Sequence, residues 1–358
     1  MSRNVLVLGA GLVGSSLGLA LTRAGYDVVL WDIAASHALV AAGLGAGRVS
    51  DERTDNPDIV VVATPPDVIP GLVAEVLGKF PDAVITDVGS VKAPILAAID
   101  RLAPEHRRYV GSHPMAGSQF TGPLTASGDL FRDRTWVVTP EPENSQEDVA
   151  LIEQMAHDVG ARVVTMPANE HDEAVAQVSH LPHLMSILTA SHLREIPQSN
   201  LRLAGQGIRD VTRIAGSDPA LWRQILTANA AAVRHELLGV SRDLTQLIDL
   251  LDSPAELERF LGVGQAGALS LVGKHGQEPL DMLEVTVEIP DEPRALARLF
   301  TDIGEMGFNI EDFELTHDPV REIGYLSIAV EREDAEKLRA RIVEGGWHAW
   351  AAHRGSRK

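Results

Sequence analysis

The sequence predicts an α/β protein in three parts: a doubly wound sheet, an all-helical segment and a small βαββαβ unit. Three observations lead to this prediction. A glycine-rich turn at residues 9–14 separates a strand pattern from a helix pattern. Short apolar runs alternate with helical periodicity through the first half of the chain, and strand patterns then disappear until near the C-terminus. We therefore expect domains over 1–166, 167–262 and 281–352, with a linker over 263–280.

The first domain carries the alternation of strands and helices that a parallel, doubly wound sheet requires. Helical stretches such as Ser90–Arg101 and Ser145–Val159 lie between several of the strand patterns. The expected strands are Asn4–Leu8, Val28–Trp31, Ile59–Ala63, Val84–Asp87, Tyr109–Ser112, Trp136–Thr139 and Arg162–Thr165. Such a sheet binds ligands at the carboxyl ends of its strands, so the residues that follow these strands are candidates for a site.

The second domain is expected to be entirely helical, because its apolar residues recur at helical spacing and strand patterns are absent. Ser217 or Asp218 before Pro219 has the composition of a helix start. The helices are rich in Ala and Leu. They can therefore cover the sheet domain or a second subunit.

The third domain follows a Gly-rich segment that is typical of a linker. Its patterns run in the order strand, helix, strand, strand, helix, strand, which is the ferredoxin-like arrangement. The expected elements are Met282–Ile289, Pro293–Met306, Asn309–Leu315, Glu322–Val330, Asp334–Glu344 and Gly346–Ala351.

Composition excludes several classes of function. The 358 residues contain no Cys, which excludes disulfides, thiol nucleophiles and thiolate zinc sites and fits a cytoplasmic protein. A formal net charge of −19 disfavours nucleic acid and anionic membranes as partners. No apolar run reaches the length of about 18 residues that a membrane span needs. Glycines interrupt the apolar N-terminus, so we expect a strand, turn and helix there rather than a signal peptide.

A GAGLVG motif at residues 9–14 predicts a dinucleotide site of the Rossmann type. Gly9 allows the tight turn, Gly11 lets a pyrophosphate approach the backbone, and Gly14 allows close packing of helix on strand. Asp32 ends the second strand, where a carboxylate binds ribose hydroxyls and repels a 2′-phosphate, so we expect NAD rather than NADP. A structural glycine turn with an exposed Asp32 is the alternative. The expected loop contacts are Gly9, Gly11, Leu12, Val13 and Gly14.

Three further strand ends carry unusual residues: ATPP at 63–66, TDVGSVK at 86–92 and GSHPMAG at 111–117. The prolines of the first leave few free amides and form a rigid lip, where we expect Thr64 and Pro65 to contact the cofactor. Because the carboxyl ends of parallel strands meet at one edge, we expect all three segments to converge there.

His113 is the candidate general base, because a histidine accepts a proton near neutral pH and an alcohol that loses hydride to NAD must lose a proton. Ser90 is a candidate to bind the imidazole and fix its orientation. The alternative is a loop histidine that is satisfied by its surroundings and has no catalytic role. Its place at the end of a strand in a dinucleotide-binding sheet favours catalysis.

The helical segment supplies a second group of histidines: His171, His180 and His183. His180 and His183 are three residues apart and can share one face of a helix. A metal site is the alternative, but the chain has no Cys and no paired carboxylates at ligand spacing, so we expect no metal.

Arg213 stands just before a predicted helix start and can clamp a carboxylate, because its planar guanidinium binds carboxylates through two hydrogen bonds. A structural salt bridge with Asp210 or Asp218 is the alternative. Trp222 follows within the next helix, where a core position and a pocket position are equally open.

These motifs resemble those of the prephenate/arogenate dehydrogenase family, in order and with similar spacing, over about residues 3–260. The resemblance rests on GAGLVG, ATPP, TDVGSVK, GSHPMAG, VSHLPH and DVTRIAGSDPALW. It implies that His113 is the catalytic base, that Ser90 orients it, and that His171, His183 and Arg213 line the substrate pocket. It also implies a homodimer, with substrate sites completed near the helical interface.

The reaction implied by the resemblance is the oxidative decarboxylation of prephenate with NAD, on the route to tyrosine, and arogenate is the alternative substrate. Ser118 and Gln119 are further candidates for substrate binding. Six residues after His113, some prephenate-using members carry an acidic residue where this chain has Gln119. That difference leaves the choice of substrate open. Two remote alternatives are a 3-hydroxyacid-type dehydrogenase and a non-enzymatic NAD sensor. The first uses a lysine from its helical domain, and no lysine lies in this helical segment.

The C-terminal unit resembles an ACT domain, a module that binds amino acids, so tyrosine is a candidate effector. The match includes residues 289–296 and 306–310. Arg294 follows Pro293 where a glycine is usual, which removes backbone freedom for close approach of a ligand. A structural or dimerising domain without a ligand is therefore the alternative.

Overall fold

The computed structural model describes residues 3–51, 56–117, 120–270, 282–290, 292–308, 310, 312–318 and 323–353. The chain forms two compact units, Met1–Ile248 and Asp249–Lys358. No helix in the described ranges is long and apolar enough to cross a bilayer.

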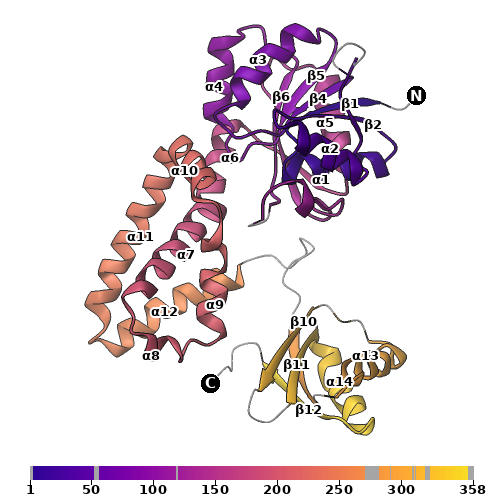
Figure 1. Cartoon of the computed structure of the whole chain (residues 1–358). Coiled ribbons are helices and arrows are strands. Elements are labelled where there is room, and N and C mark those ends of the chain that lie inside the picture. The colour runs from indigo at the N-terminus through magenta and orange to yellow at the C-terminus, as the bar shows by residue number, and fades with distance from the viewer. Residues whose placement is uncertain are drawn as a thin grey trace. The chain divides into compact units, whose positions relative to one another are not determined.

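An eight-stranded sheet with the order β3-β2-β1-β4-β5-β6-β7-β8 is the centre of the first unit (Figure 1). The strands are β1 (Asn4–Leu8), β2 (Asp27–Trp31), β3 (Arg48–Val49), β4 (Ile59–Val62), β5 (Val84–Asp87), β6 (Tyr109–Pro114), β7 (Thr135–Thr139) and β8 (Arg162–Thr165). Strands β1 to β6 are mutually parallel, so their carboxyl ends share one edge. The predicted Rossmann-type fold class is confirmed.

The sheet is mixed rather than purely parallel, because β7 runs antiparallel to β6, with His113 opposite Val137. Strand β8 is parallel to β7. A parallel crossover needs a long connection, usually a helix. The described part of the β6–β7 connection holds only one short 3-10 turn, Pro123–Thr125. The two-residue strand β3 was also not expected from the sequence, since so short a strand leaves no periodicity.

Helices cover both faces of the sheet and bury its Val- and Ile-rich strands. Residues of α1, α2 and α5 form one core with the strands, and residues of α3 and α4 form the other. The helices are α1 (Leu12–Arg23), α2 (Ala35–Gly43), α3 (Ile69–Lys79), α4 (Ala93–Leu102) and α5 (Gln146–Asp158). Ser145 begins α5, where its Oγ accepts the backbone N–H of Asp148 at 3.0 Å.

The rest of the first unit is helical, as the sequence predicted. Its elements are α6 (Ala168–Val175), a π-helical turn (Ala176–His180), α7 (Leu181–His192), a 3-10 turn (Leu193–Glu195), α8 (Gln198–Leu201), α9 (Gln206–Thr212), a 3-10 turn (Arg213–Gly216), α10 (Pro219–Ala228) and α11 (Ala230–Leu250). Asp218 caps α10 by accepting the N–H of Ala220 at 2.9 Å. Ile225 and Trp222 of α10 join the core on the α3–α4 side, which fixes this helix to the sheet domain.

The second unit contains α12 (Pro254–Leu269) and a four-stranded antiparallel sheet with the order β10-β11-β9-β12. Its other elements are β9 (Met282–Pro290), α13 (Ala295–Met306), β10 (Asp312–Asp318), β11 (Ile323–Glu331), α14 (Arg332–Glu344) and β12 (His348–His353). This is the predicted ferredoxin-like order. The expected linker over 263–280 is wrong at its start, because α12 continues to Leu269 through two glycines; residues 271–280 lie outside the described ranges.

Candidate active site

The glycine turn after β1 is closed toward the sheet and open on its outer side. Gly9 has a backbone φ of +102°, and a Cβ there would overlap the carbonyl oxygen of Ala63. A Cβ on Gly14 would overlap the carbonyl oxygen of Gly9, so α1 approaches the turn through a glycine. At Gly11 a Cβ would meet no atom within 4 Å. The open backbone at Gly11, at the N-terminus of α1, fits the approach of a pyrophosphate.

Two further residues beside this turn fit a dinucleotide. Asp32 accepts the backbone N–H of Ala10 at 2.7 Å and that of Ala34 at 2.8 Å. Each carboxylate oxygen has a second lone pair, so Asp32 can still accept ribose hydroxyls. The Cγ2 methyl group of Thr64 lies next to Gly9, and the buried Oγ1 of Thr64 has no hydrogen-bond partner among the described residues. An unpaired buried hydroxyl beside an open glycine turn fits a bound dinucleotide.

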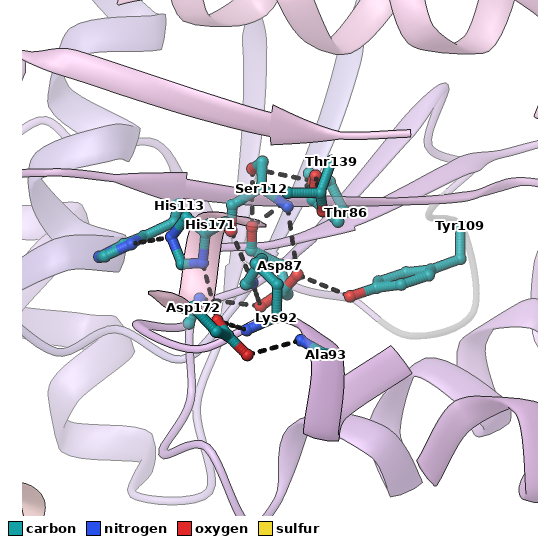
Figure 2. Close-up of polar contacts among 12 residues, drawn as sticks. Thr86, Asp87, Lys92, Ala93, Tyr109, Ser112, His113, Thr139, His171 and Asp172 are labelled. Atoms are coloured by element: carbon teal, nitrogen blue, oxygen red, sulfur yellow. Dashed lines mark hydrogen bonds and ion pairs between the residues drawn. The ribbon is translucent and has the colours of Figure 1, made fainter. Parts of the chain in front are cut away.

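The strand that carries His113 is held in place by a buried ion pair (Figure 2). Lys92 and Asp87 pair with both side chains fully buried, and Lys92 Nζ also donates to the carbonyl oxygen of Ser112 at 2.7 Å. Tyr109 donates its hydroxyl to Asp87 at 2.8 Å, and Ser112 Oγ donates to the carbonyl oxygen of Asp87 at 2.7 Å. Because Ser112 precedes His113, these contacts fix the end of β6 from which the imidazole projects.

The imidazole of His113 meets a second histidine, which comes from the helical segment (Figure 2). Its Nδ1 lies 2.9 Å from Nε2 of His171, and the two rings are nearly perpendicular, at 77°. Nδ1 of His171 lies 2.8 Å from Oδ1 of Asp172. Asp172 also accepts the backbone N–H groups of Lys92 at 2.8 Å and Ala93 at 2.9 Å. Three side chains thus connect the end of β6 to α6 and to the start of α4.

The surroundings of His113 favour its neutral form. Burial lowers the pKa of His113 well below its usual range, and the nearby charge of Lys92 lowers it further. Only a neutral imidazole accepts a proton. The site therefore contains a base that is ready at neutral pH.

His180 and His183 lie beside Trp222 of α10. The ring of His183 is stacked on the indole, with centroids 3.4 Å apart and planes at 5°, while His180 meets the indole edge-on at 6.0 Å. Asn229 donates to the carbonyl oxygen of Asp172 at 2.7 Å, and its Nδ2 lies 3.3 Å from Nδ1 of His180. Burial lowers the pKa of His180 to about 4 and also lowers that of His183. Both rings are therefore neutral at neutral pH and act through hydrogen bonds and stacking.

Arg213 begins the 3-10 turn that packs against α7, the helix of His183. Its side chain is exposed and forms no ion pair with any described residue. Asp210 accepts a hydrogen bond from Gln206, and Asp218 caps α10. The salt-bridge alternative for Arg213 is therefore wrong, and the guanidinium is free to bind an anionic ligand.

Two expected contacts differ from the sequence-based prediction. Nδ1 of His113 is bonded to His171, and no hydrogen bond joins Ser90 to the imidazole among the described residues; Ser90 lies half-buried between β5 and α4. His171 was expected to line the substrate pocket, but it is fully buried and both of its nitrogens are bound. A role for Ser90 elsewhere in the site stays a prediction. Ser118 and Gln119 lie outside the described residues.

Sequence reasoning missed two polar residues of this site, Asp172 and Asn229. Both are buried, Asp172 in contact with His171 and Asn229 in contact with His180. Asp172 stands next to His171 in the chain, and a carboxylate beside a histidine on an otherwise apolar helix face was a usable signal. Asn229 gave no signal, because it follows the end of α10 and meets Asp172 only in the folded chain.

The comparisons with known proteins give matches over most of the chain. Residues 17–165 match the family model "Prephenate dehydrogenase, nucleotide-binding domain", and residues 167–262 match "Prephenate dehydrogenase, dimerization domain". The "Probable prephenate dehydrogenase NovF" of Streptomyces niveus is 31% identical, over 97% of this chain and 99% of that protein.

Two solved structures resemble about three quarters of the chain. Prephenate dehydrogenase from A. aeolicus, in complex with hydroxyphenyl propionate and NAD+, is 27% identical with a TM-score of 0.69, over 75% of this chain and 98% of that one. Arogenate dehydrogenase from Synechocystis is 26% identical with a TM-score of 0.64, over 74% of this chain and 98% of that one.

Proposed function

Because the chain belongs to the prephenate dehydrogenase family, we propose that it oxidatively decarboxylates prephenate to 4-hydroxyphenylpyruvate with NAD, in tyrosine biosynthesis. Its glycine turn and the family match identify it as an NAD-dependent dehydrogenase. The family match excludes the two remote alternatives, a 3-hydroxyacid-type dehydrogenase and a non-enzymatic NAD sensor. The observation that carries the proposal is the buried imidazole of His113, which is neutral and fixed at the carboxyl edge of the sheet that bears the glycine turn.

In the proposed mechanism His113 takes the proton of the ring hydroxyl, and the carbon–oxygen bond gains double-bond character as hydride leaves the same carbon. NAD, when bound at the glycine turn, supplies the hydride acceptor. The ring carboxylate departs as CO₂, and the electron pair of the broken carbon–carbon bond makes the ring aromatic. The oxygen then recovers its proton from His113, so the base ends the cycle neutral.

Binding of the substrate requires local positive charge, because the chain carries a formal net charge of −19 and prephenate is a dianion. Arg213 supports this requirement, since it is exposed and free of ion pairs with described residues. We assign it one substrate carboxylate through paired hydrogen bonds. His183 and His180, both neutral, offer hydrogen bonds to the remaining polar groups, and Trp222 offers an apolar surface beside them.

Arogenate is the second candidate substrate, because the similar structures include an arogenate dehydrogenase. The two substrates differ in a keto acid or an amino acid side chain. Initial rates of NADH formation with each substrate, and with NADP in place of NAD, test the proposal. We expect the highest kcat/KM for prephenate with NAD. A preference for arogenate would assign the alternative, and turnover of neither would contradict the proposed function.

We also propose that the chain acts as a cytoplasmic homodimer. The helical segment matches a dimerization domain, and α11 presents exposed apolar side chains, including Leu238, Leu244 and Ile248. Sedimentation equilibrium should give twice the mass of one chain. A monomer that retains full activity would contradict this part of the proposal.

Tyrosine is proposed as an effector of the ferredoxin-like domain. In support, Arg294 adopts a left-handed conformation with φ of 74°, so the backbone keeps the shape that glycine usually gives at this position. We expect added tyrosine to lower the rate or raise the unfolding temperature of the second unit. No response to any aromatic amino acid would favour a structural domain.

A further inference from the structure

We propose that Asp172 and His171 are positioning residues that make Nε2 the proton-accepting nitrogen of His113. The inference rests on the proposed function, because it concerns the base of that reaction. The resemblance implied that His171 lines the substrate pocket and gave Asp172 no role. Here His171 instead orients His113, and Asp172 orients His171. Figure 2 shows the three side chains in a line from α6 to the end of β6.

The carboxylate of Asp172 fixes the direction of the first hydrogen bond. It is buried, and its two oxygens already accept the backbone N–H groups of Lys92 and Ala93 at 2.8 and 2.9 Å. An ionised carboxylate has lone pairs and no proton to donate. His171 must therefore donate from Nδ1, across the 2.8 Å contact with Oδ1.

The second hydrogen bond then follows from the first. A neutral imidazole carries one N–H, so a His171 that donates from Nδ1 presents a lone pair at Nε2. That lone pair faces Nδ1 of His113 at 2.9 Å. His113 must therefore donate from Nδ1, which leaves the lone pair of its Nε2 available to the substrate. The tautomer of the base is thus set by a carboxylate two side chains away.

The same line of groups favours the transient positive charge on His113. When His113 takes the proton, the lone pair of His171 and the negative charge of Asp172 stabilise the imidazolium. The other charged or titratable groups around it are Lys92, which Asp87 neutralises, and His180 of the π-helical turn. Among the described residues around His113, Asp172 is the carboxylate that acts on it through His171, whereas the charge of Asp87 is matched by Lys92.

Four variants test the rate. Asp172→Asn and His171→Leu should each lower kcat by about 10²-fold or more with little change in the KM for NAD, because the wrong tautomer places an N–H against the substrate. His171→Gln should retain a rate within about 10-fold of wild type, because its amide accepts from His113 and donates to Asp172. Glu173→Gln is the matched control, since it removes a charge from the next, exposed residue and should leave kcat unchanged.

The pH profile separates positioning from a merely structural role. His113 acts only when neutral, so kcat falls as pH drops through its pKa in the complex. Removing the negative charge in Asp172→Asn should lower that pKa, so the acid limb moves to lower pH while the plateau falls. An unchanged acid limb, or equal rates for His171→Gln and His171→Leu, would overturn the proposal.

A measurement independent of turnover is the NMR spectrum of the holoenzyme with ¹⁵N-labelled histidine. The signals are assigned by comparison with variants that each lack one histidine. Nitrogen chemical shifts should show that His113 and His171 both carry their proton on Nδ1. A proton on Nε2 of His113, or a doubly protonated His171, would overturn the inference. If wild type does not turn over either substrate, the proposed function fails; if wild type turns over and the tautomers differ, only this inference fails.

Discussion

At the end of β6 the base His113 is buried and bonded through His171 to Asp172, whereas Arg213, on the 3-10 turn beside α7, is exposed and has no ion pair among the described residues. The first region is complete within a single chain. The second offers an exposed charge, without an ion pair among the described residues, that a ligand or a second subunit can bind. The difference indicates that the base is already positioned before substrate binds, whereas Arg213 gains its partner only when a substrate carboxylate binds.

The largest expected effect is on stability and concerns the buried side. Lys92→Met leaves Asp87 unpaired in the core and should lower the free energy of unfolding of the first unit by about 3–5 kcal/mol, measured by urea titration. Arg23→Met, in an exposed pair with Asp129, is the control and should cost at most about 1 kcal/mol. Equal losses of unfolding free energy in the two variants would show that the buried pair stabilises the fold no more than the exposed pair does.

On the exposed side we expect an effect on binding alone. Arg213→Lys should raise the KM for prephenate by about 10- to 100-fold, because the paired hydrogen bonds to a carboxylate are lost, with kcat and the unfolding temperature nearly unchanged. Arg209→Lys, exposed on α9 four residues earlier, is the matched control. A fall in stability, or an unchanged KM, would contradict the assignment of Arg213 as a ligand group.

The buried histidines should make the first unit less stable in acid. Burial lowers the pKa of His180 from 6.5 to about 4, so the unfolded chain binds a proton more readily. The contribution to stability is complete above pH 6.5 and is lost as pH falls toward 4. His180→Gln should make the urea midpoint depend less on pH across this window, whereas the same change at the exposed His192 should leave the pH dependence as in wild type. Identical pH profiles for wild type and His180→Gln would contradict this sign.

The smallest expected effect lies outside both regions. Arg294 holds a left-handed backbone, so Arg294→Gly should stabilise the second unit by about 0.5–1 kcal/mol without changing kcat, as followed by thermal unfolding. A loss of stability would mean that contacts of the Arg294 side chain outweigh its backbone strain.

Local pattern predicted most of the sheet. The bounds of β1, β5 and β8 match the structure residue for residue, because turn residues enclose each of these short runs of β-branched and other apolar side chains. His113 was placed at a strand end for the same reason. The antiparallel direction of β7 was not predictable, since direction depends on how the β6–β7 connection crosses the sheet edge and leaves no periodicity in either strand.

The contacts within the site were harder to predict than its members. His113 and His171 were both named, yet their pairing joins residues 58 apart in the chain and depends on how α6 packs against the sheet. Asp172 was missed because its partners, the N–H groups that begin α4, are backbone atoms that no side-chain pattern reveals. The sequence therefore indicated the chemistry, and tertiary packing decided which group orients which.

The most direct test of the account is the rate of NADH formation by His113→Asn with prephenate, measured beside the affinity for NAD. We expect turnover to fall by about 10²-fold or more while NAD binds as in wild type, because the base is lost and the glycine turn is untouched. A variant that keeps a rate close to wild type would show that another group takes the proton.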